Sequence, residues 1–244
     1  MFIADDIKSL AFIGSPSLFD DICFIYPLTV GTVLALQNSH KYDIYLRILT
    51  IDRFYIRELA KEKGIELLET REPFDFLVDS AQLDSIFLLE LQDAFRTFIK
   101  EEITITFEPK QIIVGDITER RVLNQENFEE FQNILRLQNN IAVVNPIPKD
   151  ESEKVRKFRE KQELRDAVKK KQNSASAPEF SVLLSALCAY GVGITPFNVK
   201  DLSIYAFYSL FGISNSREKF DIDMNYLYAG VSPKKLNPKH WISK

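Results

Sequence analysis

The sequence is poor in glycine, cysteine, histidine and tryptophan. Its 244 residues include 8 glycines, 2 cysteines, 2 histidines and 1 tryptophan. Folds rich in sheet and tight turns need more glycine than this, so the composition favours helices. The two histidines, His40 and His240, lie two hundred positions apart, and local sequence cannot combine them with a cysteine into a zinc site. The shortages therefore predict a mainly helical protein and give no support for a metal centre.

Long apolar runs are also missing. None approaches the ~18 residues that a membrane-spanning helix needs. Asp5 and Asp6 stand where a signal peptide would carry basic residues. Cys23 and Cys188 lie far apart in apolar stretches, which favours buried free thiols over a disulfide. We therefore expect a soluble protein of a reducing cytoplasm.

No motif for catalysis or cofactor binding stands out. Residues 221–225 resemble the start of a calcium loop, but the glycine of the sixth position is missing and Ser232 replaces the glutamate of the twelfth. Gly191 and Gly193 belong to no G-x-G-x-x-G or G-K-[ST] pattern. His40 follows an Asn-Ser pair at a helix boundary, which favours a surface or capping role over a catalytic one. We expect no catalytic residue, no metal and no cofactor, hence a protein that is not an enzyme.

Charge is unevenly distributed along the chain. The formal net charge is -4, which gives no general attraction for nucleic acid or acidic membranes. Residues 149–171 are the exception, with ten Lys or Arg against six Asp or Glu. The interleaved acids dilute the positive field, and no aromatic platform for bases accompanies it. A solvated helical linker is favoured there over a nucleic-acid contact.

The N-terminal part combines helices with extended segments. A turn signal between two apolar runs predicts a β-hairpin from about Leu10 to Ile25. Alternation over residues 103–107 and the apolar run 112–114 predict a second hairpin. Helical spacing dominates the remainder, so residues 1–145 are predicted to form an α+β domain. The fold class is mainly α (α+β), with one or two small β-hairpins in the N-terminal part.

The strongest helical signal lies within residues 73–102. Ile86, Leu89, Phe95 and Phe98 recur there at helical spacing. The apolar stripe is wide, and we expect it to be buried on more than one side.

Capping residues place several helix ends. Thr29 is predicted to cap a helix, and Asp52 is predicted to begin another that Gly64 closes. Asp201 or Asn198 is the candidate cap of a later helix.

The chain divides after the N-terminal domain. Residues 146–177 contain prolines, many charges and an Asn-Ser-Ala-Ser-Ala-Pro run, and read as a basic helical or flexible linker. Residues 178–244 are predicted to be a C-terminal helical module with three helices, the last closed by Gly230. A basic tail follows, in which Trp241 is expected to act as an amphipathic anchor rather than as part of a chemical site.

Both ends of the chain resemble one group of proteins. The N-terminal match includes Ile25 to Thr29, Tyr42, Tyr45 and Leu46. The C-terminal match includes Leu202, Tyr205, Tyr208, Tyr228, Ala229, Gly230, Lys239, His240 and Trp241. In these two blocks of roughly 90 residues the chain resembles phage tail assembly chaperones and other tail-region proteins of phages that infect Gram-positive bacteria. Ala206 and Pro238 depart from the pattern.

The resemblance implies binding rather than chemistry. Tail assembly chaperones coat the tape measure protein until tail tube protein displaces them. The implied partners are these tail proteins or further copies of the chain, with no small-molecule substrate and no membrane. The implied location is the host cytoplasm. The alternative is a structural virion protein of the neck, tail or baseplate. Phe207, Phe211, Tyr228 and Trp241 are the candidate partner-binding residues, although each aromatic residue is also a natural core residue.

Overall fold

The computed structural model describes residues 4–37, 41–64, 71–142, 165, 179–191 and 193–231. Its α-helices are α1 (Ala4–Phe12), α2 (Val30–Gln37), α3 (Lys41–Leu49), α4 (Arg53–Lys63), α5 (Pro73–Leu83), α6 (Ser85–Ile99), α7 (Phe128–Gln138), α9 (Phe180–Tyr190) and α10 (Ile204–Tyr228). Short 3-10 helices are η2 (Ile117–Glu119) and η3 (Val199–Asp201). The strands are β1 (Ser17–Phe19), β2 (Cys23–Ile25), β3 (Ile103–Phe107), β4 (Lys110–Val114) and β5 (Val122–Leu123). The predicted fold class is confirmed: the protein is mainly helical, with two small antiparallel sheets in its N-terminal half.

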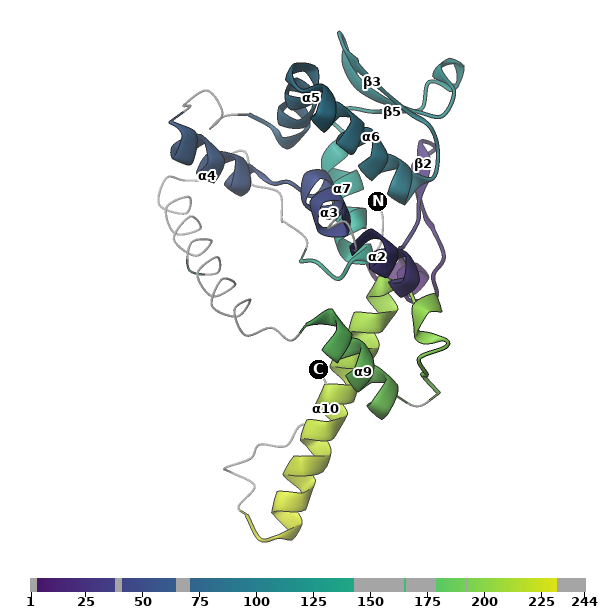
Figure 1. Cartoon of the computed structure of the whole chain (residues 1–244), viewed down its shortest axis with the longest axis vertical. Coiled ribbons are helices and arrows are strands. Elements are labelled where there is room, and N and C mark those ends of the chain that lie inside the picture. The colour runs from purple at the N-terminus through teal and green to yellow at the C-terminus, as the bar shows by residue number, and fades with distance from the viewer. Residues whose placement is uncertain are drawn as a thin grey trace.

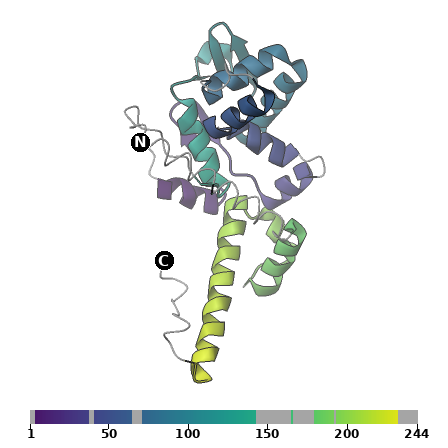
Figure 2. The same cartoon turned by 90° about the vertical axis from the view of Figure 1, so that its left-hand side faces the viewer.

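The elements form a body from which one long helix projects. Helices α1 to α7 and both sheets make up the body, and α10 extends away from it with α9 alongside (Figures 1 and 2). No helix among the described residues is long and apolar enough to cross a membrane.

The first hairpin is shorter than predicted. Strand β1 pairs with β2 around a turn at residues 20–22, and the apolar run before it belongs to α1. Ile7 and Ala11 recur at helical spacing and are buried where α1 contacts α7 and α10. Packing of this helical face against the body stabilises a helix here in place of the predicted first strand. Gly14, where a hairpin turn was predicted, instead ends α1, with a φ of 77°.

The second hairpin is confirmed. Strands β3 and β4 pair in antiparallel register from Ile103 opposite Val114 to Phe107 opposite Lys110, and the turn lies at Glu108 and Pro109. Strand β5 adds a third strand beside β4. Its two residues are too short to produce an alternating pattern, and the sequence therefore gave no prediction for it.

Three of the predicted caps are present. The hydroxyl of Thr29 accepts the backbone N–H of Thr32, and the carboxylate of Asp52 accepts that of Tyr55. Gly64 has the left-handed φ of 66° that ends α4. Helix α10 is capped by Ser203, not by Asn198 or Asp201, which lie in or beside η3.

The long helical stripe of residues 73–102 is broken at Asp84. Its carboxylate accepts the N–H groups of Ile86 and Phe87, so α6 starts there as a separate helix. Phe95 is fully buried in the second half of α6, as predicted. Ile86 and Leu89 are largely exposed, and the prediction that they are buried was wrong. Because α6 begins as a new helix at Ser85, the side chains of Ile86 and Leu89 in its first turns face solvent.

The core of the body is centred on phenylalanine rings. Phe131 of α7 lies 6.0 Å from Phe19, 5.5 Å from Phe95 and 5.9 Å from Phe128 between ring centroids. Phe19 belongs to β1 and Phe95 to α6, whereas Phe128 and Phe131 are both on α7. The cluster therefore joins α7 to β1 and α6.

Polar side chains of α7 fix the backbone around it. The buried amide of Gln132 donates to the carbonyls of Leu49 and Ile51, which join α3 to α4. The buried amide of Gln138 donates to Ser17 and to the carbonyl of Ile25. These bonds satisfy backbone carbonyls inside the body, so the buried polar groups of α7 have a structural role.

The two thiols differ in accessibility. Cys23 of β2 is buried and Cys188 of α9 is half-buried; both are free. Burial, together with the nearby carboxylate of Glu101, raises the pKa of the Cys23 thiol to about 12, and Arg121 acts in the opposite direction. Cys23 therefore stays protonated and unreactive in the folded protein.

This difference predicts a pH effect. An unfolded thiol ionises near pH 8.5, so above that pH the unfolded state loses a proton that folded Cys23 retains. Stability is expected to fall as the pH rises towards 12, by about 2 kcal/mol at pH 10. Urea titrations at pH 8 and 10 measure the loss, and a Cys23→Ala variant should show a smaller difference between the two pH values. Fast reaction of both native thiols with Ellman's reagent at pH 8 would contradict the assigned burial.

Candidate functional site

The start of α10 is tied to the body by backbone hydrogen bonds. The N–H of Ile204 donates to the carbonyl of Leu28, and the N–H of Val30 donates to the carbonyl of Leu202, both at 2.8 Å. The hydroxyl of Ser203 accepts a backbone N–H of the first turn of α10. The beginnings of α2 and α10 are thus held together, and this fixes the direction in which α10 leaves the body.

Helix α9 packs beside the first half of α10. The rings of Phe180 and Phe207 lie 5.1 Å apart, and Leu187 is buried between the two helices and the body. Helix α9 ends at Tyr190, while α10 continues well beyond it (Figures 1 and 2). Among the described elements, α9 therefore packs against the first part of α10 only, and no other element covers the later part.

Helix α10 is continuous where two helices were predicted. The run Ser214 to Ser216 has the composition of a loop, but the hydroxyl of Ser216 donates to the carbonyl of Gly212 within the helix. Such bonding lets a serine stay inside a helix without a break. One rigid element thus spans the predicted second and third helices of this region.

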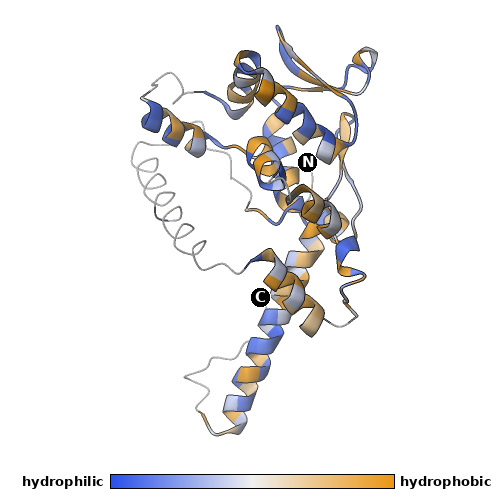
Figure 3. Cartoon of the chain, in the orientation of Figure 1, coloured by the Kyte–Doolittle hydropathy of each residue, from blue (hydrophilic) through white to orange (hydrophobic). Residues whose placement is uncertain are grey.

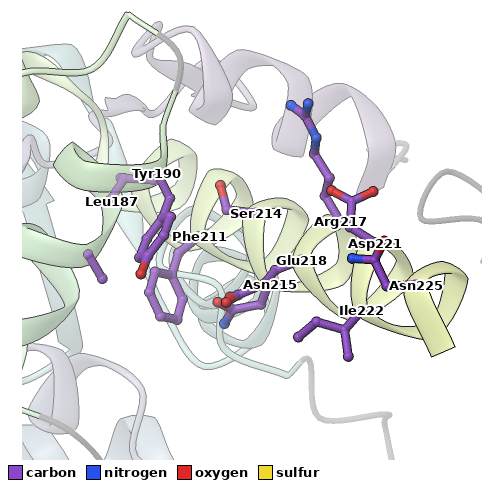
Figure 4. A pocket seen from close by; sticks show the side chains of 11 residues that line it. Leu187, Tyr190, Phe211, Ser214, Asn215, Arg217, Glu218, Asp221, Ile222 and Asn225 are labelled. Carbon is purple, nitrogen blue, oxygen red and sulfur yellow. The ribbon is translucent and has the colours of Figure 1, made fainter. Parts of the chain in front are cut away.

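An open groove of about 580 Å³ lies where α9 ends and α10 continues. Its lining residues are Ala186, Leu187 and Tyr190 of α9 and Phe211, Ser214, Asn215, Arg217, Glu218, Asp221, Ile222 and Asn225 of α10. The rings of Tyr190 and Phe211 lie at one end, and Asp221 and Asn225 lie at the other (Figure 4). The groove thus changes from aromatic to polar along α10.

The groove follows one face of α10. Positions 211, 215, 218, 222 and 225 are separated by four or three residues and share a side of the helix. Helix α9 is hydrophobic along most of its length, whereas the outer part of α10 alternates between hydrophobic and hydrophilic residues (Figure 3). A partner in this groove must therefore supply both apolar and polar contacts.

Three charged side chains line the groove without forming an ion pair among the described residues. Arg217, Glu218 and Asp221 form no ion pair with the residues that the structure describes. In the body, by contrast, Arg121 and Lys110 each contact two carboxylates. The groove charges are available to a partner that carries charges of both signs.

The groove carries apolar, hydrogen-bonding and charged side chains. Its side chains include no histidine or cysteine, and within the described parts of the chain no three His, Cys, Asp or Glu side chains are grouped so as to hold a metal ion. Aromatic rings at one end and hydrogen-bonding groups along its length suit a helix or an extended peptide segment.

The predicted partner-binding residues lie in different environments. Phe207 is fully buried in the core, where a partner has no access to it. Phe211 is partly buried and lines the groove. Tyr228 is 81% exposed at the end of α10, outside the groove lining. Trp241, with the basic tail, lies outside the described residues, as do most of the residues of the predicted linker 146–177.

Sequence reasoning missed most of the groove. Tyr190, Asn215, Glu218 and Ile222 were not candidates. The signal that could have revealed them is the helical spacing of three or four residues, which continues from Phe211 through three further turns of α10. It was lost because the second and third helices of the C-terminal module were predicted as separate elements.

The region of the chain that carries the groove is similar to a known family. Residues 169–244 match the family described as the YomV second domain. The match spans α9, α10 and the groove between them. YomV is a protein of a Bacillus prophage, and the match indicates a phage-related protein. No curated protein and no solved structure matches the chain.

Proposed function

We propose that this protein is a non-enzymatic phage tail assembly chaperone that binds the tape measure protein during tail morphogenesis in the host cytoplasm. The observation that supports it most is the open groove on the projecting helix α10, inside the region similar to a prophage protein. A long helix with a groove along one face, as seen among the described residues, suits reversible capture of a partner segment. The resemblance of both chain ends to tail assembly chaperones supports the tape measure protein as the partner.

Co-expression tests this proposal directly. The tape measure protein encoded by the same phage is expected to become more soluble, and to co-purify, when this chain is produced with it. Unchanged solubility together with no co-purification would refute the chaperone function.

A groove variant locates the contact. Ile222→Ser is expected to reduce co-purification by about tenfold, because it removes an apolar contact from the groove. Ile213→Ser is the matched control: both isoleucines are on α10, with exposures of 43% for Ile213 and 46% for Ile222, and only Ile222 lines the groove. Equal effects of the two substitutions would place the contact elsewhere.

The alternative is a structural virion protein of the neck, tail or baseplate. Mass spectrometry of purified particles separates the two functions, because an assembly chaperone is expected to be absent from the finished particle. Stoichiometric copies in the virion would favour the structural function and refute the chaperone.

A further inference from the structure

The corner between α5 and α6 exposes three large aliphatic side chains. Leu83 is 89% exposed, Ile86 70% and Leu89 61%. They follow one another at three-residue spacing, and Ile86 and Leu89 lie on adjacent turns of α6. Single exposed apolar residues are normal on a protein surface, whereas contiguous apolar patches mark interaction sites. We call these three residues the aliphatic corner.

The helical hairpin that carries the corner is strongly acidic. Residues 72–95 contain six acidic side chains and no basic one. The acids near the start of α5 are neutralised from outside the hairpin. Glu72 pairs with Arg53, and Asp79 pairs with Lys110 at 2.6 Å.

The carboxylates beside the aliphatic corner are less completely neutralised among the described residues. Glu90 forms no ion pair with the described residues, and the carboxylate of Asp84 accepts only backbone N–H groups of α6. Asp93 lies 3.6 Å from Arg96, which makes a closer pair with Glu102 at 2.8 Å. The aliphatic corner therefore lies in a negative local field.

We propose that the aliphatic corner binds a positively charged amphipathic helix of another protein. The apolar face of such a helix would cover Leu83, Ile86 and Leu89, and its Lys or Arg side chains would pair with Glu90 and Asp93. A second copy of the chain would bring the same carboxylates to a symmetric contact, and like charges would oppose it. The corner lies on the body, at the opposite end of the molecule from the projecting end of α10 (Figure 1), so this site is separate from the groove.

A peptide probe tests the proposal on the full chain. The probe is a fluorescein-labelled peptide of about 18 residues, or five helical turns, with leucines on one face and lysines along its flanks. We expect saturable binding by fluorescence anisotropy that weakens as salt is added. The double variant Ile86→Ser/Leu89→Ser and the single variant Glu90→Lys should each raise Kd by about tenfold or more. A peptide with glutamate in place of lysine should not bind.

Controls make each outcome decisive. Ile117→Ser changes an isoleucine that is 63% exposed in η2 and should leave Kd unchanged. All substituted side chains are exposed, and circular dichroism melts should match those of the parent protein. The proposal is overturned if the double variant binds the probe as tightly as the parent, if Ile117→Ser weakens binding equally, or if the acidic peptide binds as well as the basic one. It is also overturned if the parent sediments as a dimer that Ile86→Ser/Leu89→Ser dissociates, because the occupant is then a second copy.

Discussion

Replacing Phe131 by alanine is expected to lower the free energy of unfolding by about 3–5 kcal/mol. The ring is fully buried and contacts Phe19, Phe95 and Phe128 at the centre of the body. The substitution removes the apolar contacts of a whole ring and leaves a cavity that β1, α6 and α7 must share. Small domains are stable by only about 5–15 kcal/mol, so this loss is a large part of the total. Urea-induced unfolding followed by circular dichroism measures it.

An exposed phenylalanine provides the control for this prediction. Phe197 is 87% exposed, and Phe197→Ala should change stability by no more than about 0.5 kcal/mol. Similar effects at the two positions, or a loss below about 1 kcal/mol for Phe131→Ala, would show that the phenylalanine cluster is not the centre of the core.

Periodicity in the sequence predicted elements better than it predicted which faces are buried. Together with the capping residues, it identified α4 with both of its ends and the hairpin of β3 and β4. Periodicity reports which side of an element is apolar, and most such sides are buried. It cannot report that α6 is left uncovered at Ile86 and Leu89, because that depends on where Asp84 breaks the hairpin.

The groove shows a second limit of sequence reasoning. It exists because α9 ends at Tyr190 while α10 continues through Asn215 and Ile222 without a break. A serine and asparagine run is a common loop signal, and only hydrogen bonding within the helix, as at Ser216, decides the outcome. The buried amides of Gln132 and Gln138 are similar cases, since their partners are backbone carbonyls distant in the sequence. No local pattern encodes such partners.

Replacing Gly115 by alanine is expected to cost about 3 kcal/mol of stability, for two separate reasons. Gly115 has a φ of 72°, a conformation that costs an ordinary residue about 1 kcal/mol. An added Cβ would also lie 2.1 Å from Nη2 of Arg121 and 3.1 Å from Oε2 of Glu101. The guanidinium must therefore move, and with it the paired contacts to Glu101 at 3.0 and 2.6 Å and the bond to the carbonyl of Ile22. These contacts connect the loop after β4 to the turn between β1 and β2. Breaking the partly buried pair of Arg121 and Glu101 contributes about 2 kcal/mol to the expected loss of stability.

Two comparisons separate the backbone term from the collision at Gly115. Gly14 has a φ of 77° with nothing within 4 Å of an added Cβ, so Gly14→Ala should lose only about 1 kcal/mol. In an Arg121→Ala background the collision partner is gone, and Gly115→Ala should then be as mild as Gly14→Ala. Denaturant titrations of these variants give all the required differences. If Gly115→Ala is no more harmful than Gly14→Ala in the parent chain, the ion pair of Arg121 and Glu101 does not hold the loop. If its effect is undiminished without Arg121, the strain arises from the backbone alone, and the guanidinium that bonds the carbonyl of Ile22 contributes nothing to the loss.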